Sequence, residues 1–453
     1  MGRGGHGEVW AASDTKDSKV AIKILNKVKP IAYARFRDEV FVMSTCELPG
    51  VVPILEAHLP EDPQTDRPWY SMPLGRPLWD AFASKDPRAI SGAFVRIAET
   101  LASLHAQKIA HRDIKPANLL LIGNSPAIAD FGLVDYPDKQ ELTAPREAIG
   151  PRVAMAPEIR ELGPAADALP ADVYSLAKTF WMFLTGRKQG FEGQYHDDTS
   201  IGLRQHIRNE YLAPLENLLK AATDHRPTSR PTMAEFQARL KEWLRIVDSW
   251  EERNPLEWID VQRRLFPVIR PERAIWTDID DIVQILSLLG ERTGLNHLFF
   301  PSGGGMDLTG AIRSDVEPGC IELDTEGQTV VLRPARLLFE SFGTDAQWDY
   351  FRLEAAPLDP SGVYDEAGLG LDEEVTEIPD VGYVERWHWD ENEYEEKSLP
   401  EGSRVVSRYF GGAFVIFQKT SFYNRISATY DARHNKMSAD EFREYMSKGA
   451  VSR

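Results

Sequence analysis

The segment His111–Asn118, which reads HRDIKPAN, is the feature of this sequence that most constrains the fold. Six polar or special residue types stand within these eight positions, so an accidental match is rare. Asp113 can accept or orient the proton of an attacking hydroxyl, and Lys115 can offset charge on a phosphoryl group in transfer. Asn118 can ligate Mg²⁺ through its amide oxygen. The segment therefore predicts a centre for phosphoryl transfer.

A second metal ligand is expected at Asp130, which opens the tripeptide DFG. Two apolar runs, at 118–122 and 127–129, predict a hairpin that brings Asp130 beside Asn118. Two oxygen ligands from separate loops suit Mg²⁺, which takes few protein ligands and completes its coordination with phosphate oxygens.

A glycine-rich stretch at Gly2–Val9, GRGGHGEV, offers a place for phosphates, because glycines let backbone amides approach phosphate oxygens closely. Taken alone it is equally well a plain turn. A dinucleotide-binding fold would need a strand before the glycines and a helix after them. Here a strand-like run, Val20–Leu25, follows instead.

Lys23 lies inside this apolar run, and burying its ammonium is costly unless it meets opposite charge. ATP phosphates and a carboxylate would supply that charge, and Glu39, on the helix expected next, is the best candidate for the carboxylate. The alternative is a surface lysine whose stem alone is buried.

The chain is long enough for two or three domains. Up to about residue 75 it reads as short strands with one helix at 32–46, and from about 90 to 247 it reads as mostly helical. A buried helix is expected from Asp172 to a stop at Gly186. The proline-containing segment 251–275 reads as a linker. Residues 276–453 are expected to form a separate α+β domain, with helices at 278–290 and 439–446 and strands at 329–332 and 404–419.

Composition excludes several classes of function. The net charge of −18 argues against nucleic-acid binding, which needs a surface rich in Lys and Arg. No apolar stretch approaches the length of a membrane span, and we expect no membrane partner. Two cysteines without metal-ligand spacing indicate a reducing compartment and predict a cytoplasmic protein.

The segment between Glu354 and Pro400 contains fifteen acidic residues and two basic ones. Such a composition is typical of a solvated segment, and it also fits a docking surface for a basic partner.

On these motifs, residues 1 to about 250 resemble the eukaryotic-type protein kinase superfamily, most closely its bacterial serine/threonine members. The resemblance implies a two-lobed α+β fold, with a small β-rich N-lobe at about 1–74 and a helical C-lobe at about 75–250. It implies ATP and Mg²⁺ as cofactors and a protein substrate. We recognise no family in residues 276–453.

The resemblance also implies roles for individual residues. Asp113 would be the catalytic base, with Lys115 and Lys23 as further catalytic groups, and Asn118 and Asp130 would bind magnesium. Met72 resembles the gatekeeper that borders the adenine site, and Asp172 resembles the aspartate that braces the catalytic loop. Met43, His111 and Phe131 match members of a stacked hydrophobic spine. The residues implied to contact or support the nucleotide are Gly2, Gly4, Gly7, Val9, Ala21, Lys23, Glu39, Met72 and Leu74.

Specificity and regulation follow from the same resemblance. The pattern D-x-K-P-x-N from Asp113 to Asn118 is typical of serine/threonine enzymes. Arg112 could pair with a phosphate on the activation loop, for which Thr143 is the candidate acceptor; an unmodified loop threonine is the alternative. Self-association for autophosphorylation in trans would accompany such control. Glu158, in the tripeptide APE, is expected to form a structural ion pair with Arg230.

Two departures from the family pattern stand out. Met1 adjoins the glycine-rich stretch, so the strand that normally leads into it is missing. We expect a true start upstream of Met1, and a cut-down N-lobe is the alternative. Pro151 stands where most serine/threonine members have a threonine that bridges the catalytic aspartate and lysine, so substrate choice does not follow by analogy.

The sequence thus favours an active, ATP- and Mg²⁺-dependent serine/threonine protein kinase whose C-terminal domain senses a signal or recruits the substrate. Two alternatives stay open. One is a pseudokinase that binds ATP as an interaction module, and the other is a small-molecule phosphotransferase of the same fold.

Overall fold

The computed structural model describes most of the chain, and its contacts divide the chain into two compact units. The first unit comprises Met1–Ile207 with Leu212–Asp248, and the second comprises Arg208–Tyr211 with Ser249–Arg453. The described residues are 2–3, 7–13, 17–26, 28–82, 86–137, 139, 155–197, 199–207, 210–291, 296–301, 303–315, 317–326, 329–343, 346–357, 372–378, 382–385, 404–409, 411–421 and 436–451.

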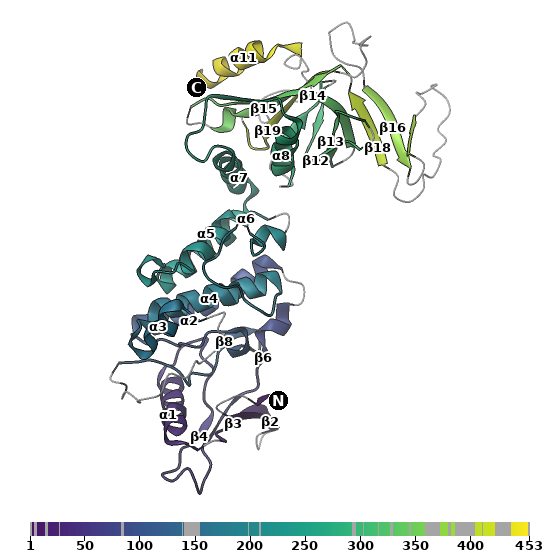
Figure 1. Cartoon of the computed structure of the whole chain (residues 1–453). Coiled ribbons are helices and arrows are strands. Elements are labelled where there is room, and N and C mark those ends of the chain that lie inside the picture. The colour runs from purple at the N-terminus through teal and green to yellow at the C-terminus, as the bar shows by residue number, and fades with distance from the viewer. Residues whose placement is uncertain are drawn as a thin grey trace. The chain divides into compact units, whose positions relative to one another are not determined.

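The first unit begins with an antiparallel sheet and one helix, α1 (Pro30–Thr45) (Figure 1). The sheet order is β1-β2-β3-β5-β4, and its first strand is limited to two residues that pair with β2. Proline at the first position of α1 has the backbone angle that a helix start requires. The strands are β1 (Gly2–Arg3), β2 (Glu8–Ser13), β3 (Lys19–Ile24), β4 (Glu56–His58) and β5 (Trp69–Pro73).

The remainder of the first unit is mainly helical, and α4 (Ala168–Thr185) runs through its centre. Nearly every side chain of α4 is buried, as its apolar sequence predicted. The helix starts earlier than predicted, because the Asp167 side chain accepts a hydrogen bond from the Leu169 amide and caps it; it ends at Gly186, which has a left-handed φ of 65°. The other helices are α2 (Pro87–Ala106), α3 (Pro157–Leu162), α5 (Ala213–Ala222) and α6 (Met233–Asp248), with 3-10 turns at Leu78–Phe82, Pro116–Asn118, Gly163–Ala165, Leu203–Gln205 and Pro227–Ser229.

A small sheet of three strands joins the segment before α2 to the segment after it. Its strands are β6 (Arg76–Pro77), β7 (Leu119–Ile122) and β8 (Ser125–Ile128). The β7–β8 pair is the hairpin predicted from the two apolar runs. It follows directly on Asn118 and leads directly toward Asp130.

The second unit is built on a mixed sheet of eleven strands with a helix on each face. Its longest strand, β14 (Thr329–Glu340), pairs with β13 and, in parallel, with β18 in its first part, and with β15 and β9 in its second. The other strands are β9 (Arg273–Trp276), β10 (Asn296–Phe299), β11 (Gly305–Met306), β12 (Leu308–Arg313), β13 (Ile321–Thr325), β15 (Tyr350–Ala356), β16 (Asp372–Ile378), β17 (Gly382–Glu385), β18 (Arg404–Tyr409) and β19 (Gly412–Gln418), with a 3-10 turn at Ala346–Trp348.

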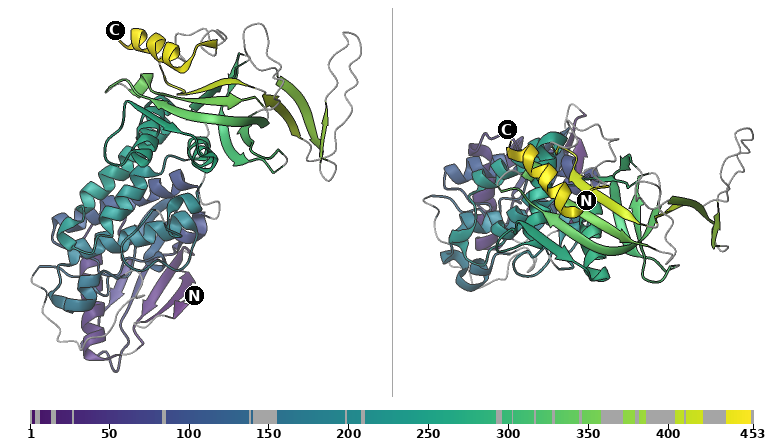
Figure 2. Two further views of the ribbon diagram at one scale, coloured as in Figure 1. Left: turned by 45° about the horizontal axis from the view of Figure 1, so that its top comes forward. Right: turned by 90° about the horizontal axis from the view of Figure 1, so that it is seen from above.

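Two apolar clusters hold helices on this sheet. On one face lies α8 (Ile279–Gly290), whose Leu286 and Leu289 belong to the same buried cluster as Leu337 and Phe351 of the sheet. On the other face, α11 (Ala439–Val451) lies across the sheet, as Figure 2 shows, and its Phe442 and Met446 pack against a smaller aromatic cluster.

The segment predicted as a linker, 251–275, is a helix for most of its length. This helix, α7 (Trp250–Leu265), is capped by the Ser249 side chain and contains Pro255. Trp258 and Val261 are fully buried in the larger apolar cluster of the second unit. The linker interpretation is therefore corrected: the prolines at 255, 267 and 271 lie in and after a structural helix.

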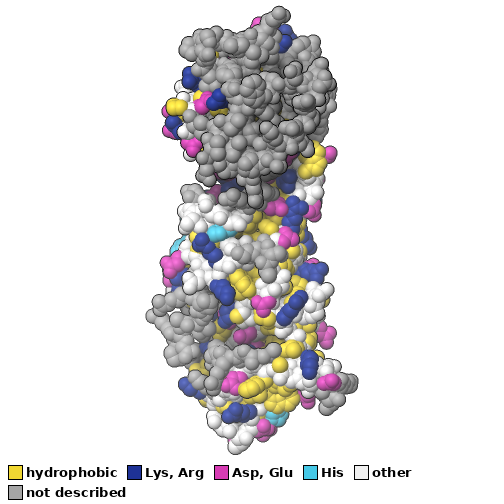
Figure 3. All heavy atoms as spheres, turned by 90° about the vertical axis from the view of Figure 1, so that its right-hand side faces the viewer, with side chains coloured by type: hydrophobic (Ala, Val, Ile, Leu, Met, Phe, Trp, Pro, Cys, Tyr) yellow, Lys and Arg dark blue, Asp and Glu magenta, His cyan; other side chains and the backbone are white. Residues whose placement is uncertain are grey.

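Two further observations concern the surface. In the described part of the chain no helix is both long and apolar enough to cross a membrane. On the face of the first unit shown in Figure 3, Lys and Arg side chains are interspersed with Asp and Glu.

Candidate active site

Lys23 stands at the centre of a buried ionic cluster in the first unit. Its ammonium lies 2.7 Å and 2.9 Å from the two carboxylate oxygens of Glu39 on α1, and 2.9 Å from Oδ1 of Asp130. The Tyr70 hydroxyl donates a hydrogen bond of 2.8 Å to Glu39. Lys23 and Glu39 are both buried, so the surface-lysine interpretation is wrong. The cluster joins the N-terminal sheet, α1 and the DFG tripeptide in one place.

Burial and pairing act against each other on the pKa values of this cluster. Burial alone would lower the pKa of Lys23, but the carboxylates of Glu39 and Asp130 hold it well above its usual value. For Asp130, burial raises the pKa, but the nearby Lys23 ammonium outweighs burial, and the pKa is lowered to about 2. For Glu39, burial is the larger influence and raises the pKa. Lys23 is thus a fixed positive charge, and Asp130 is an anion at neutral pH.

The second part of the site is the catalytic loop that precedes β7. The Lys115 ammonium lies 2.7 Å from Oδ2 of Asp113, and the Asn118 amide nitrogen donates to the same oxygen at 3.1 Å and to the Asp113 carbonyl at 2.7 Å. With Oδ2 held by two donors, Oδ1 of Asp113 makes no hydrogen bond to the described residues. A substrate hydroxyl could use that oxygen.

Asp172 fixes the loop from the buried side. Its carboxylate accepts hydrogen bonds from the backbone amides of His111, at 2.7 Å, and Arg112, at 2.8 Å. Arg112 has a φ of 66°, a left-handed conformation that costs a non-glycine residue roughly 1 kcal/mol or more. The paired amides hold the backbone in this conformation, which turns Asp113 toward the site. Asp130 has a similar φ of 64°.

His111 links the loop to the DFG tripeptide. Its Nε2 lies 3.1 Å from the Ala129 carbonyl oxygen, and its ring meets the Phe131 ring edge-on with centroids 4.6 Å apart. Both side chains are fully buried, and Met43 of α1 is buried as well. The Ala129 amide also donates to the Asn118 carbonyl at 2.9 Å, so Asn118 and Asp130 are tied together through one residue.

The donor atoms of Asn118 and Asp130 fit a magnesium ion. The Asn118 amide nitrogen is used in hydrogen bonds to Asp113. Its Oδ1, like Oδ2 of Asp130, has no hydrogen-bond partner within the described parts of the chain. These are one neutral and one anionic oxygen ligand, which suits Mg²⁺ when phosphates supply further oxygens.

The residues expected at the nucleotide come together on one sheet. Val9 pairs with Lys23 across β2 and β3, and Ala21 pairs with Met72 across β3 and β5. Leu74 follows β5 and is half-buried. A Cβ atom on Gly7 would lie 2.7 Å from the Ile24 carbonyl oxygen, so only glycine fits there without a shift. Gly2 pairs through its backbone with Val9, whereas Gly4 lies outside the described residues.

The regulatory candidates are only partly described. One guanidinium nitrogen of Arg112 lies 3.9 Å from a carboxylate oxygen of Asp135, and the other donates to the Gly163 carbonyl at 3.3 Å. Thr143 and Pro151 lie outside the described residues. The predicted pair of Glu158 and Arg230 is present as two buried hydrogen bonds of 2.6 Å and 2.9 Å.

Sequence reasoning missed Tyr70 and Asp38. Tyr70 stands directly opposite Lys23 in the pairing of β3 and β5, so the spacing of those strands could have indicated it. Asp38 precedes Glu39 on α1 and binds Tyr136 and Lys139 of the segment that follows the DFG tripeptide. No short motif marks this second contact.

This combination of a small sheet, a lysine–glutamate pair and a loop that holds Asp113 beside Lys115 and Asn118 is typical of a protein kinase fold. A model of the protein kinase domain matches residues 1–240, and the chain belongs to this family.

Curated relatives of the chain carry the names of serine/threonine kinases. The DNA damage-responsive serine/threonine-protein kinase RqkA of Deinococcus radiodurans is 30% identical over 262 residues, which is 52% of this chain and 38% of the relative. The serine/threonine-protein kinase PknB of Mycobacterium tuberculosis is 28% identical over 287 residues, 58% of this chain and 44% of the relative. A putative serine/threonine-protein kinase, R436, of Acanthamoeba polyphaga mimivirus is 30% identical over 158 residues, 34% of this chain and 57% of the relative. The chain therefore spans about 40–60% of the length of these relatives.

Proposed function

We propose that this chain transfers the γ-phosphate of ATP to serine or threonine hydroxyls of a protein. The observation that carries the proposal is the contact of Lys23 with both Glu39 and Asp130, which aligns the N-terminal sheet with the DFG tripeptide. Membership of the protein kinase family and the names of the relatives support it.

In this proposal Lys23 binds the α- and β-phosphates, and its interaction with Glu39 keeps it in place. Gly2, Gly4 and Gly7 bring backbone amides to the phosphates, while Val9, Ala21, Met72 and Leu74 enclose the adenine. Asn118 and Asp130 would hold Mg²⁺, which would supply positive charge that offsets the phosphates.

Asp113 is the proposed catalytic base. Its Oδ2 is occupied by Lys115 and Asn118, and Oδ1 accepts the hydrogen bond of the substrate hydroxyl and orients it for attack. Lys115 moves its charge from Asp113 toward the phosphoryl group as negative charge develops there.

The proposal includes regulation by phosphorylation and a role for the second unit. A phosphate on Thr143, added in trans by a second copy of the chain, would join Asp135 in binding Arg112. We further propose that the second unit senses a signal or recruits the protein substrate, because the proposed catalytic residues all lie in the first unit.

The test is transfer from ATP labelled in its γ-phosphate, with Mg²⁺, to the chain itself and to generic protein substrates. Asp113→Ala should lower the rate at least about a hundredfold, because a positioned base contributes that much or more. Binding of ATP without any transfer would favour the pseudokinase alternative. Label found in small molecules and not in protein would favour the small-molecule phosphotransferase.

A further inference from the structure

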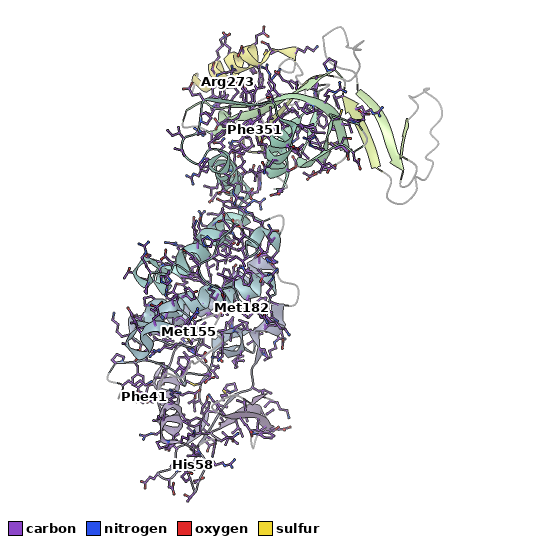
Figure 4. The ribbon with its side chains drawn as sticks, in the orientation of Figure 1. Phe41, His58, Met155, Met182, Arg273 and Phe351 are labelled. Atoms are coloured by element: carbon purple, nitrogen blue, oxygen red, sulfur yellow. The ribbon has the colours of Figure 1, made fainter. Side chains whose placement is uncertain are left out.

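Side chains of the segment that follows the DFG tripeptide contact α1. The Tyr136 hydroxyl donates a hydrogen bond of 2.8 Å to Oδ1 of Asp38, and the Lys139 ammonium lies 3.5 Å from Oδ2 of the same residue. The Tyr136 ring also packs on the ring of Phe41, one helical turn further along α1, with centroids 5.7 Å apart. Figure 4 shows Phe41 on the outside of this helix. Three contacts thus join two elements that are about 100 residues apart in sequence.

Asp38 is the immediate neighbour of Glu39, the partner of Lys23. Successive helix residues point about 100° apart, so Asp38 and Glu39 face different parts of the molecule. Glu39 is buried beneath the helix, and the Asp38 side chain is 20% exposed at its edge. A helix held at both points cannot rotate about its axis without breaking one contact. Holding Asp38 therefore fixes where the Glu39 carboxylate lies.

The same contact extends toward the catalytic loop as a row of alternating charges. Lys139 interacts with Asp38 on one side and with Asp135 on the other. Asp135 in turn approaches Arg112, and its backbone exchanges two hydrogen bonds of 2.8 Å with Ala110. The position of α1 is thereby linked to the loop that carries Asp113.

The Tyr136 hydroxyl must stay protonated to donate its hydrogen bond to Asp38. Burial, together with the hydrogen bond to the Asp38 carboxylate, raises the pKa of its hydroxyl to about 12. At neutral pH the phenol therefore keeps its proton, and the carboxylate is the acceptor.

We propose that Asp38 is a positioning residue, which holds α1 through Tyr136 and Lys139 so that Glu39 stays in contact with Lys23. The proposal rests on the proposed kinase activity and deepens it. Asp38 touches neither nucleotide nor substrate in this assignment; it acts through Glu39. Residues 135, 136 and 139 then keep α1 aligned with the site.

The test compares Asp38→Ala and Tyr136→Phe with Glu47→Ala in the full chain. Glu47→Ala is the matched control, because it removes an exposed carboxylate just beyond the end of α1. Alanine is a better helix former than aspartate, so a loosened helix in Asp38→Ala cannot result from lower helix propensity.

Steady-state kinetics and amide hydrogen exchange are measured on each variant. We expect kcat to fall about tenfold in Asp38→Ala and about threefold in Tyr136→Phe, the scale of losing hydrogen bonds to a charged group. The KM for the protein substrate should stay unchanged, because the substrate does not contact Asp38. Amide hydrogen exchange across α1 should be faster in both variants and unchanged in Glu47→Ala. The variant that combines Asp38→Ala with Tyr136→Phe should be no worse than Asp38→Ala, because Asp38→Ala already removes the hydrogen bond that Tyr136→Phe removes.

Exchange and kcat in Asp38→Ala that equal those of Glu47→Ala would overturn the assignment. If the unaltered chain transfers no phosphate, the proposed function fails, and hydrogen exchange across α1 alone then decides the role of Asp38. The two failures are therefore distinguishable.

Discussion

Among the described residues of the first unit, Lys23 and Lys178 are the buried lysines, and their surroundings shift their pKa values in opposite directions. Lys23 meets two carboxylates, which hold its pKa well above the usual value. Lys178, on α4, is fully buried and donates to the carbonyl oxygens of Phe191 and Gly193. It also lies 3.4 Å from the centre of the Phe191 ring. Burial, together with the positive charge of Arg160, lowers the pKa of Lys178 to about 7, and the charge of Glu192 does not offset them.

The low pKa of Lys178 predicts that the free energy of unfolding depends on pH, and Lys178→Met should remove this contribution. Between about pH 7 and about pH 10.5 the unfolded chain binds a proton at Lys178 that the folded chain does not. The folded state therefore gains stability as pH rises through this window, with a slope of at most about 1.4 kcal/mol per pH unit. Urea denaturation of the full chain at several pH values measures it. Equal slopes in the unaltered chain and in Lys178→Met would contradict the low pKa.

A second residue-scale prediction concerns the ion pair of Glu158 and Arg230. The side chain of Arg230 is fully buried, so removing its carboxylate partner leaves a charge without compensation. Glu158→Ala should lower the free energy of unfolding of the first unit by roughly 3–5 kcal/mol. Glu161→Ala, on the same helix and exposed, should change it by less than about 0.5 kcal/mol. Similar losses in both variants would show that the pair does not stabilise the fold.

At the scale of elements, local patterns predicted the first unit better than the second. The β7–β8 hairpin and α4 followed from apolar runs and a glycine stop, which are properties of neighbouring residues. The contact of Lys23 with Glu39 was predicted as well, because a lysine in an apolar strand needs a counter-charge. The contact of Asp38 with Tyr136 was not, because it depends on the path of a loop between distant residues.

The helix α7 was missed because the prolines in and after it outweighed the helical spacing of its apolar residues in the prediction. Prolines at 255, 267 and 271 favoured a linker over 251–275, although Trp258, Val261 and Leu265 stand at helical spacing. Pro255 lies in the first half of the helix, where the loss of one backbone hydrogen bond is tolerated because the buried face stabilises the rest.

Trp258→Ala tests whether α7 belongs to the core of the second unit. The Trp258 side chain is fully buried and meets Phe351 edge-on, with ring centroids 5.7 Å apart. Truncation should lower the free energy of unfolding of the second unit by about 3–5 kcal/mol. Hydrogen exchange in α8 should become faster, and exchange in α2 and α4 of the first unit should not change. Uniformly faster exchange in both units would contradict the division described above.

At the scale of the whole molecule, the sequence predicted two units but not the architecture of the second. Its sheet depends on β14, whose first part pairs in parallel with β18 some 75 residues later. Pairing over that separation leaves no local signal, since a strand pattern fixes which side chains share a face and not which strand lies beside it. The helix α11 was predicted at 439–446, and its buried Phe442 and Met446 explain its place on the sheet.

The most direct test of the central claim is the chemical identity of the phosphorylated residues. The chain is incubated with ATP and Mg²⁺, with and without protein substrate, and the modified side chains are identified by mass spectrometry beside Asp113→Asn. Phosphate on serine or threonine that is absent with Asp113→Asn is the predicted result. Measurable ATP binding with no phosphorylated side chain, or phosphate on tyrosine alone, would contradict a serine/threonine protein kinase.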